Sequence, residues 1–313
     1  MRDAEVALAQ VVLFVAAALL AGGALAQLRL VATTAELESL AVAVGGDRIA
    51  ATHLIPAGRD GETFQPRPQD LVTLREARAV LRVGVDYDLW LDRLLRRSGN
   101  AGIQRGAPGY IDASRDVALL DVRAGGVGSS DGHAHGRGNP HYWLDPMNAE
   151  MITATILEAL AALDPANAKG YEENRLAFMA ELERRMHTWS RALPHSTAIL
   201  AQHDTWPYFA RRFRLRFVGI IEPRPGVPPG PAHLATLART PGVTAIVRQP
   251  HEPQRDAEFL SAKTGAPVVI LASGVGAVPE ARDYFSLIDY NVRALSLSRH
   301  PGRRDRADGP GPN

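Results

Sequence analysis

The feature that most constrains the fold is an alternation of short apolar segments with helical segments, which runs along the chain twice. In the first half the predicted strands cover residues 28–33, 49–55 and 79–84, and the predicted helices cover residues 35–44, 68–77 and 89–97. After Pro194 the alternation restarts, with strands at 197–202, 216–221, 244–248 and 267–272 and helices at 206–213, 231–239, 255–264 and 284–297. Strands that alternate with helices of this length form βαβ units, which predicts parallel sheets.

A long helical segment separates these two halves. A helix predicted at 147–163 is broken by Asp164-Pro165, and a longer one follows from about residue 166 to residue 193. Polar residues lie on nearly every side of this longer predicted helix, as in a helix that bridges domains. We therefore predict an α/β protein of two lobes, each a mainly parallel sheet flanked by helices, joined by one long linking helix. The predicted boundaries are 27–165 for the N-terminal lobe, 166–193 for the linking helix, 194–299 for the C-terminal lobe and 300–313 for a disordered tail.

The N-terminal segment resembles an export signal. Residues 11–26 form an apolar run that closes with the small-residue pattern Ala24-Leu25-Ala26, which predicts a signal peptide at 1–26 that is cleaved after Ala26. Two acidic residues offset the charge of Arg2, so an uncleaved anchor or a misassigned start codon is the alternative. No later segment is long and apolar enough to span a membrane. We expect the mature protein to be soluble in the periplasm.

Charge and cysteine content narrow the classes of function. The formal net charge is +1, so no strong electrostatic field favours nucleic acid as a partner. The chain has no cysteine, which excludes thiolate metal sites, cysteine nucleophiles, disulfides and a lipid-modified N-terminal cysteine. Any metal ion must therefore be bound by His, Asp or Glu.

Four such side chains stand at the end of a predicted strand or in the following loop: Glu62, His141, His203 and Asp283. Ligands of open parallel sheets bind beyond the carboxyl ends of the strands. Two imidazoles and two carboxylates can form a closed shell around a divalent ion, and the anionic ligands offset its charge. Each residue also has a simpler interpretation. Loop histidines are often solvated, Glu62 could cap the helix near Pro68, and Asp283 could be the N-cap of the last helix.

A series of motifs adds to this interpretation. In chain order they are GGDRI at 45–49, LIPAG at 54–58, TFQPRPQD at 63–70, NPHYWLDP at 139–146, HD at 203–204, YF at 208–209, EPQ at 252–254 and DYFSLIDYN at 283–291. Singly these motifs are modest. Taken in this order, across residues 28–297, they resemble the metal-specific solute-binding proteins of bacterial ABC transporters, the group that delivers zinc, manganese or iron.

The resemblance implies that His141, His203 and Asp283 are metal ligands. The chain departs from the pattern at the first ligand loop, where the family usually has His and this chain has Glu62. Glu62 could coordinate through oxygen, or the site could have lost a ligand and hold three protein ligands and a water. Carboxylate oxygen suits manganese and ferrous iron better than additional imidazole does, whereas the general affinity order favours zinc. We expect zinc as the ion, followed by manganese or iron.

The function that the resemblance implies is that of the periplasmic binding component of an ABC importer. Such a protein captures a divalent metal between its two lobes and delivers it to a membrane permease, so the metal is cargo. We expect a monomer that is not an enzyme and does not bind nucleic acid. The alternative is an exported metal-dependent hydrolase with an open three-ligand site and Glu62 as general base. No His-Glu-x-x-His motif supports it. A surface adhesin is the third interpretation.

Two further features stand beside the predicted site. The polar, Gly-rich segment 125–139 carries His133 and His135, which could form a metal-collecting loop or be incidental residues of a solvated linker. Trp143 adjoins His141, and we expect it to form a wall of the site. The other histidines and tryptophans are interpreted as surface and core residues.

Overall fold

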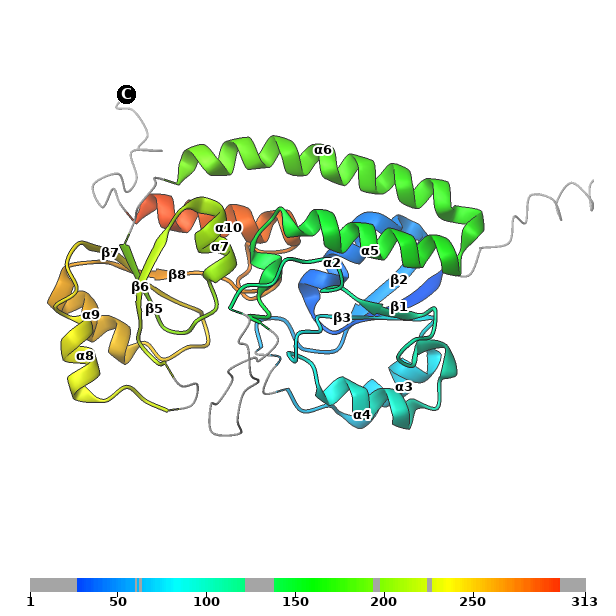
Figure 1. The fold of residues 1–313 in the computed structure, drawn as a ribbon, viewed down its shortest axis with the longest axis horizontal. Coiled ribbons are helices and arrows are strands. Elements are labelled where there is room, and N and C mark those ends of the chain that lie inside the picture. The colour runs from blue at the N-terminus through cyan, green and yellow to red at the C-terminus, as the bar shows by residue number, and fades with distance from the viewer. Residues whose placement is uncertain are drawn as a thin grey trace, which may run out of the picture.

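The structure is a computed structural model that describes residues 27–59, 61, 64–121, 138–193, 198–223 and 227–298. Two parallel four-stranded sheets, each flanked by helices, lie at opposite ends of an elongated molecule, and one long helix runs along a side of both (Figure 1). The predicted fold class is therefore confirmed. The predicted signal peptide and tail lie outside the described residues, as do Glu62, His133 and His135.

The N-terminal sheet has the strand order β2-β1-β3-β4 and is parallel throughout. Its strands are β1 (Leu28–Ala32), β2 (Ile49–His53), β3 (Ala79–Arg82) and β4 (Tyr110–Asp112). The helices of this part are α2 (Ala35–Gly45), α3 (Pro68–Glu76), α4 (Trp90–Ser98) and α5 (Asn148–Leu163), with short 3₁₀ turns at Gly46–Arg48, Ala101–Ile103, Tyr142–Leu144 and Pro165–Asn167. The edge strand β4 was not predicted, because its three residues, Tyr-Ile-Asp, are not part of an apolar run, whereas the equally short β8 lies in the apolar run VVILA at 268–272.

The C-terminal sheet repeats this arrangement in the order β6-β5-β7-β8. Its strands are β5 (Ala198–Ala201), β6 (Arg216–Ile220), β7 (Val243–Arg248) and β8 (Val268–Ile270), and its helices are α7 (Pro207–Phe213), α8 (Pro231–Leu237), α9 (Arg255–Thr264) and α10 (Tyr284–Leu297). In both sheets the first strand lies between the second and the third, so the chain reverses direction across the sheet at that point. Loops that follow the strands around such a reversal are the usual place for a ligand.

The long helix α6 (Ala168–Ala192) joins the two sheets and packs against α2, α5 and α10. The sequence suggested a helix that is polar nearly all round, and the structure shows a narrow stripe of buried residues: Tyr171, Phe178, Leu182 and Trp189. The positions 171, 178, 182 and 189 are spaced by seven, four and seven, which keeps them on one helix face. Trp189 Nε1 also donates to Asp289 Oδ1 of α10 at 2.7 Å, so α6 is fixed along its length.

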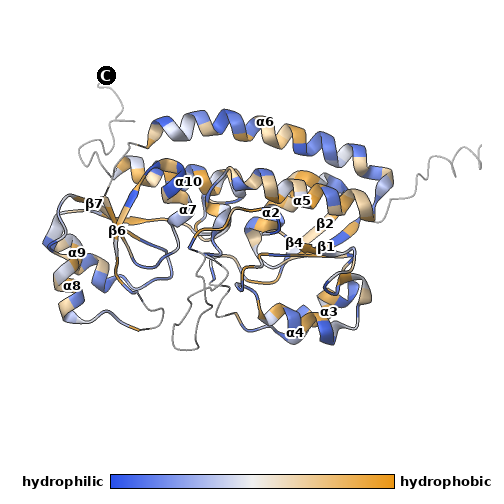
Figure 2. Ribbon diagram, in the orientation of Figure 1, coloured by the Kyte–Doolittle hydropathy of each residue, from blue (hydrophilic) through white to orange (hydrophobic). Residues whose placement is uncertain are grey.

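The hydrophobic core is shared by the two lobes. Buried side chains of both sheets, such as Leu30 and Val247, belong to one continuous apolar cluster that also contains Trp143, Trp206 and Tyr208. Figure 2 shows the apolar residues concentrated on the strands and on the helix faces turned toward them. Among the described residues no helix is both long and apolar enough to cross a lipid bilayer.

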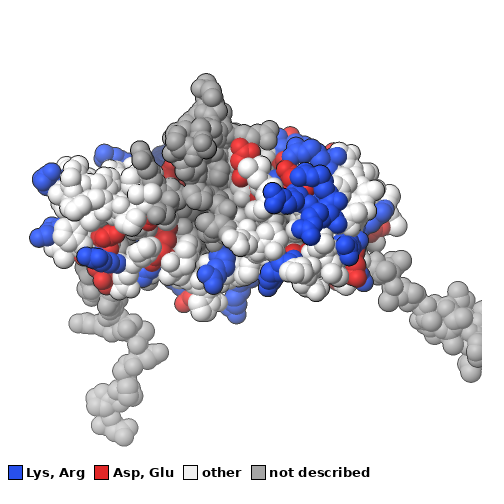
Figure 3. All heavy atoms as spheres, turned by 90° about the horizontal axis from the view of Figure 1, so that it is seen from below, with Lys and Arg blue, Asp and Glu red and all other residues white. Residues whose placement is uncertain are grey.

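Charge is unevenly distributed despite the net charge of +1. Lys and Arg side chains gather on the face seen in Figure 3, over the part of the N-terminal lobe where α3 and α4 lie. Arg93, Arg96 and Arg97 of α4 are exposed, and their spacing places them on one side of the helix. This part of the N-terminal lobe therefore presents a positively charged surface.

Candidate metal site between the lobes

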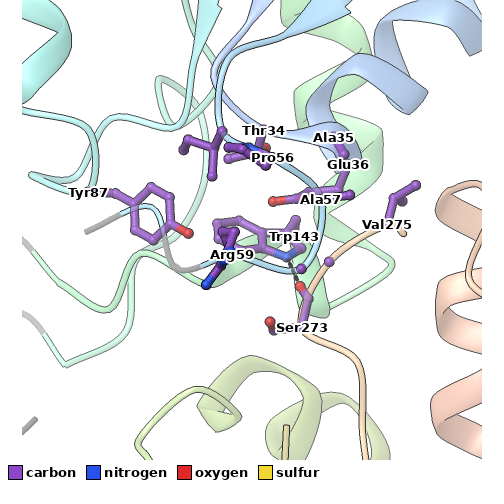
Figure 4. A pocket seen from close by; sticks show the side chains of 13 residues that line it. Thr34, Ala35, Glu36, Pro56, Ala57, Arg59, Tyr87, Trp143, Ser273 and Val275 are labelled. Carbon is purple, nitrogen blue, oxygen red and sulfur yellow. Dashed lines mark hydrogen bonds between the residues drawn. The ribbon is translucent and has the colours of Figure 1, made fainter. Parts of the chain in front are cut away.

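A small pocket lies where the two lobes meet. It is lined by residues that follow strands of both sheets: Thr34, Ala35, Glu36, Ile55, Pro56, Ala57, Gly58, Arg59, Tyr87 and Trp143 from the N-terminal lobe, and Ser273, Gly274 and Val275 from the C-terminal lobe (Figure 4). Its free volume is about 20 Å³, which is room for a water molecule and too little for an organic solute. The indole of Trp143 crosses the boundary and donates from Nε1 to Ser273 O at 2.7 Å.

His141 lies beside this pocket in an aromatic setting. Its ring centroid is 5.3 Å from that of Trp143 and 5.9 Å from that of Tyr87. Nδ1 of His141 is 3.2 Å from Asn139 Oδ1, which also accepts from the His141 backbone N–H at 3.0 Å. Because Asn139 Oδ1 receives the Nδ1 proton, the neutral ring carries its lone pair on Nε2, which is then the nitrogen suited to a metal ion.

His203 follows β5 and lies between two carboxylates. Its Nδ1 is 2.9 Å from Glu252 Oε1, and its Nε2 is 3.2 Å from Glu222 Oε2. Burial lowers the pKa of His203, but the hydrogen bond and the charge of Glu252, together with the charge of Glu222, outweigh burial and hold the pKa above its usual value of 6.5. Glu252 thus binds Nδ1 and directs Nε2 toward Glu222, an arrangement typical of metal-binding histidines.

The carboxylate of Glu252 is itself held by the ends of neighbouring strands. The backbone N–H of Gln249, after β7, donates to Glu252 Oε2 at 2.5 Å, and the side-chain amide of Gln249 donates to Oε1 at 2.9 Å. Ser273, after β8, donates to the Gln249 side chain in turn. Segments that follow β5, β7 and β8 therefore form one buried polar network around His203.

The segments that bear the two histidines are bonded to each other. Asn139 Nδ2 donates to Asp204 O at 2.8 Å, and the hydroxyl of Tyr208 donates to Asn139 O at 2.9 Å. The guanidinium of Arg212 on α7 lies 2.6 and 3.0 Å from the two carboxylate oxygens of Asp145, which is fully buried. The residues around His141 are thus fixed to the C-terminal lobe as well as to their own.

The loops near the pocket also touch across the boundary. Gly276 has a φ of 76°, and a Cβ at this position would lie 2.6 Å from Ala57 Cβ of the other lobe. Gly274 leaves space for the side chain of Glu36, since a Cβ there would lie 2.8 Å from Glu36 Oε2. The carboxyl of Glu36 is buried, and burial raises its pKa to about 7 against the smaller, opposing effect of hydrogen bonds that include one from the Val275 backbone.

Of the two roles expected for Asp283, metal ligand and helix N-cap, the structure shows the N-cap. It is exposed and is the N-cap of α10, and its carboxylate accepts from Ser286 N at 2.7 Å while Ser286 Oγ accepts from Asp283 N at 2.9 Å. Among the described residues, which include His141, His203 and Asp283, no group of three or more His, Asp or Glu side chains is arranged to hold a metal ion. The expected set of three is therefore not brought together in this part of the chain.

Two acidic residues at the site were missed by the sequence reasoning. Glu252 belongs to the EPQ motif, and Glu222 follows the predicted strand at 216–221. Glu222 could have been found by the rule that selected His203, namely that it is an ionisable residue directly beyond the carboxyl end of a strand. The sequence alone does not show that β5 pairs with β6, and this pairing places Glu222 beside His203.

Comparison with known proteins agrees with this geometry. The sequence profile of the ZnuA family, described as the zinc-uptake complex component A, periplasmic, matches residues 30–297. The iron-binding protein YfeA of Yersinia pestis is 24% identical over 286 residues, which is 86% of this chain and 85% of that protein. The high-affinity zinc uptake system protein ZnuA of Bacillus subtilis is 23% identical over 264 residues, covering 78% and 79% of the two chains.

A similar structure has also been solved. The crystal structure of a ZnuA deletion mutant with zinc bound superposes with a TM-score of 0.72 and 27% identity, covering 87% of this chain and 97% of that one. The family match spans both sheets, the linking helix and both histidine segments. This chain therefore belongs to the ZnuA family of periplasmic metal-uptake components.

Proposed function

We propose that this protein is the substrate-binding component of an ABC importer, which captures a divalent transition-metal ion between its lobes and delivers it to a membrane permease. The observation that carries the proposal is the matched orientation of His141 and His203. Each imidazole is bound through Nδ1 by a neighbouring acceptor, which places the lone pair of the neutral ring on Nε2. The two histidines come from different lobes whose segments are bonded to each other.

The remaining donors are carboxylates. Glu62, in the loop where the family usually has His, is proposed as an oxygen ligand from the N-terminal lobe. Imidazole and carboxylate together bind zinc well and also suit manganese and ferrous iron. One relative, the Bacillus subtilis protein, is named for zinc, and another, YfeA, is named for iron. We propose zinc as the main cargo, with manganese or iron next.

Setting and assembly follow from the same proposal. Members of the family act outside the cytoplasm, and we propose that residues 1–26 are a signal peptide and that the mature protein works as a monomer. The lobe boundaries near residues 165 and 194, and a collecting role for His133 and His135, also belong to the proposal. The family consists of binding proteins rather than enzymes, and no observation favours the hydrolase.

The direct test is elemental analysis of the mature protein, residues 27–313, after removal of metal and reloading with zinc, manganese and iron in competition. One tightly held ion per chain is expected, with zinc in excess over the other two. Glu62→His should raise the preference for zinc over manganese, because an imidazole replaces an oxygen ligand. A wild-type protein that retains no stoichiometric metal would refute the proposed function.

A further inference from the structure

We propose that the exposed arginines of α3 and α4 form a docking surface for lipid, which holds the protein against a bilayer that carries anionic phosphate headgroups. This surface is called the arginine face, and it consists of Arg75, Arg93, Arg96 and Arg97. The proposal rests on the proposed function for its setting, because a protein that delivers cargo to a membrane permease works beside the membrane.

The first observation is that the exposed charge of these helices has nearly one sign. The exposed charged residues of α3 and α4 are the four arginines and one glutamate, Glu76. Glu76 is paired with a cation outside the two helices, since Arg29 Nη1 lies 2.5 Å from Glu76 Oε2. Half-buried Asp92 of α4 is bound by Arg82 at 2.7 Å and lies 3.8 Å from Arg105. These carboxylates are balanced by other cations, so the charge of the arginine face is left uncompensated.

The second observation is the amphipathic pattern of α4. The buried side of the helix includes three leucines of an apolar cluster: Leu91, Leu94 and Leu95. Arg93, Arg96 and Arg97 lie on the opposite side, because residues three or four apart share a helix face. Leu89, four residues before Arg93, is 58% exposed and places one apolar side chain beside the charges. Because the apolar side of α4 is already buried in the lobe, its contact with a bilayer is peripheral and depends on charge.

The end of α3 brings the fourth arginine to the same place. Asn100, just after α4, donates from Nδ2 to the backbone oxygens of Leu74 at 3.1 Å and Ala77 at 2.8 Å. The last turn of α3, which carries Arg75, therefore lies beside the C-terminal end of α4. Both helices lie on the side of the lobe away from α6 (Figure 1), and the basic side chains of this region form one area in Figure 3.

Helix stability accounts for only part of this cluster. Cations in the last turn of a helix interact favourably with the helix dipole, and Arg75, Arg96 and Arg97 occupy such positions. Arg93 is in the first turn of α4, where the dipole disfavours a positive charge. The dipole therefore does not explain Arg93, whereas an anionic partner outside the chain explains all four arginines.

The partner that fits this surface is one of uniform negative charge. Protein–protein interfaces combine an apolar centre with a polar rim, whereas the arginine face carries charge of one sign across two helices. A bilayer with anionic lipids attracts such clusters, and the guanidinium group binds phosphate oxygens through paired N–H donors. The chain has no cysteine to carry a lipid anchor. Charge on the arginine face can therefore serve to keep the exported protein at the membrane.

The experiment measures co-sedimentation of the mature protein with phosphatidylcholine vesicles, with and without about 30% phosphatidylglycerol. We expect binding only to the vesicles that contain phosphatidylglycerol, and release at high salt, because salt screens the attraction. A variant that combines Arg93→Gln, Arg96→Gln and Arg97→Gln should bind about 100-fold more weakly, since each arginine near an anionic surface strengthens binding about fivefold.

The matched control removes the same charge from the other lobe. It combines Arg239→Gln, Arg255→Gln and Arg293→Gln, all at exposed positions. We expect it to bind vesicles within about threefold of the wild type, because these arginines do not face the bilayer with α4. An equal loss in the two triple variants would show that net charge alone attracts the protein, and the arginine face would have to be abandoned.

A third variant separates lipid from a protein partner. Combining Arg93→Lys, Arg96→Lys and Arg97→Lys keeps the charge and should preserve vesicle binding, because a bilayer surface responds to charge. Loss of vesicle binding in this variant would contradict a simple electrostatic contact with lipid.

Metal content is measured on every variant in parallel and should equal that of the wild type, because the arginine face does not line the pocket between the lobes. Retained metal also shows that the variants are folded. A wild type that holds its metal but does not bind the anionic vesicles overturns the inference, and an acidic protein surface becomes the partner to test. A wild type that binds the vesicles but holds no metal counts against the proposed function and leaves the docking surface in place.

Discussion

The two halves of the site hold their histidines in different surroundings. In the N-terminal half, His141 lies against the rings of Tyr87 and Trp143 and is oriented by the neutral amide of Asn139. In the C-terminal half, His203 lies between the carboxylates of Glu222 and Glu252. The immediate surroundings of His141 are therefore aromatic and neutral, whereas those of His203 are rich in negative charge.

This difference assigns separate tasks to the two lobes. A divalent ion leaves its hydration shell to bind, and anionic oxygens compensate for that loss more strongly than neutral groups do. We infer that most of the electrostatic contribution to affinity comes from the C-terminal half, while the aromatic walls of the N-terminal half exclude water. The predictions that follow test this division, beginning with the largest expected effect.

The largest effect is expected from removing either imidazole. His141→Ala and His203→Ala should each weaken metal binding by about a thousandfold, roughly 4 kcal/mol, because each deletes a proposed direct ligand. The measurement is metal content after gel filtration, together with chelator competition. His187→Ala, at an exposed position on α6, is the matched control and should bind like the wild type. Equal metal content in His141→Ala and the control would remove the N-terminal half from the site.

The next effect concerns Glu36, a buried acid that, unlike Glu252, has no cationic group at hydrogen-bonding distance in the described structure. Its folded-state pKa of about 7 lies above the usual value of 4.5 for a glutamate, so the stability linked to its protonation is present below about pH 4.5 and is lost as the pH rises through 7. Glu36→Gln imitates the neutral form and should stabilise the protein by about 3 kcal/mol at pH 8.

The measurement is the free energy of unfolding of the metal-free protein in urea at pH 5 and at pH 8. Glu36→Gln should gain most of its advantage at pH 8 and little at pH 5. The control is Glu172→Gln, which removes one negative charge at an exposed position on α6. An advantage that is equal at both pH values would mean that the Glu36 carboxyl does not titrate in this range.

A smaller effect is expected from the carboxylate that orients His203. Glu252→Gln should weaken zinc binding about 10–100-fold, because Gln can accept the Nδ1 proton but carries no charge. It should also lower the pKa of His203, which can be followed by NMR of the ring protons in the metal-free protein. Glu258→Gln on the exposed face of α9 controls for the loss of one negative charge. An unchanged affinity in Glu252→Gln would show that its charge is not transmitted to the metal.

The smallest effect is expected at the aromatic wall. Trp143→Phe removes the hydrogen bond from Nε1 to Ser273 O and should speed metal dissociation about fivefold, equivalent to roughly 1 kcal/mol. Trp90→Phe removes a similar bond, from Nε1 to Gly61 O, but within one lobe. It should leave the dissociation rate unchanged in stopped-flow chelation. Equal rates in the two variants would show that the bond across the lobes has no part in holding the ion.

Much of the fold could be predicted because its signals are local. Apolar runs located seven of the eight strands. The break at Asp164-Pro165 marked the start of the long helix, close to the observed start of α6 at Ala168. His141 and His203 could be selected because each lies beside a recognisable motif. The shared core between the lobes could not be predicted, since the sequence does not tell which strands from distant segments contribute to one apolar cluster.

The choice between two carboxylates shows where local signals fail. Asp283 precedes a helix and Glu222 follows a strand, and either position suits a ligand or a structural role. The structure shows that Asp283 caps α10 and that the pairing of β6 with β5 brings Glu222 beside His203, and both are three-dimensional facts. Both roles of Asp283 could be stated from the sequence, but a local pattern alone does not separate a helix cap from a metal ligand.

The bonds from Tyr208 and Arg212 to the segment of His141 bear on how the cargo is released. Because folding itself fixes these contacts, an arriving ion has little of the chain to order, and preorganisation of this kind favours tight binding. We expect the same rigidity to slow the spontaneous escape of a bound ion. On the proposed function, work would then have to be done on the loaded protein to empty it, and in an ABC importer that work comes from ATP hydrolysis on the other side of the membrane. A strain applied to α7 by the docked permease would separate the two histidines directly.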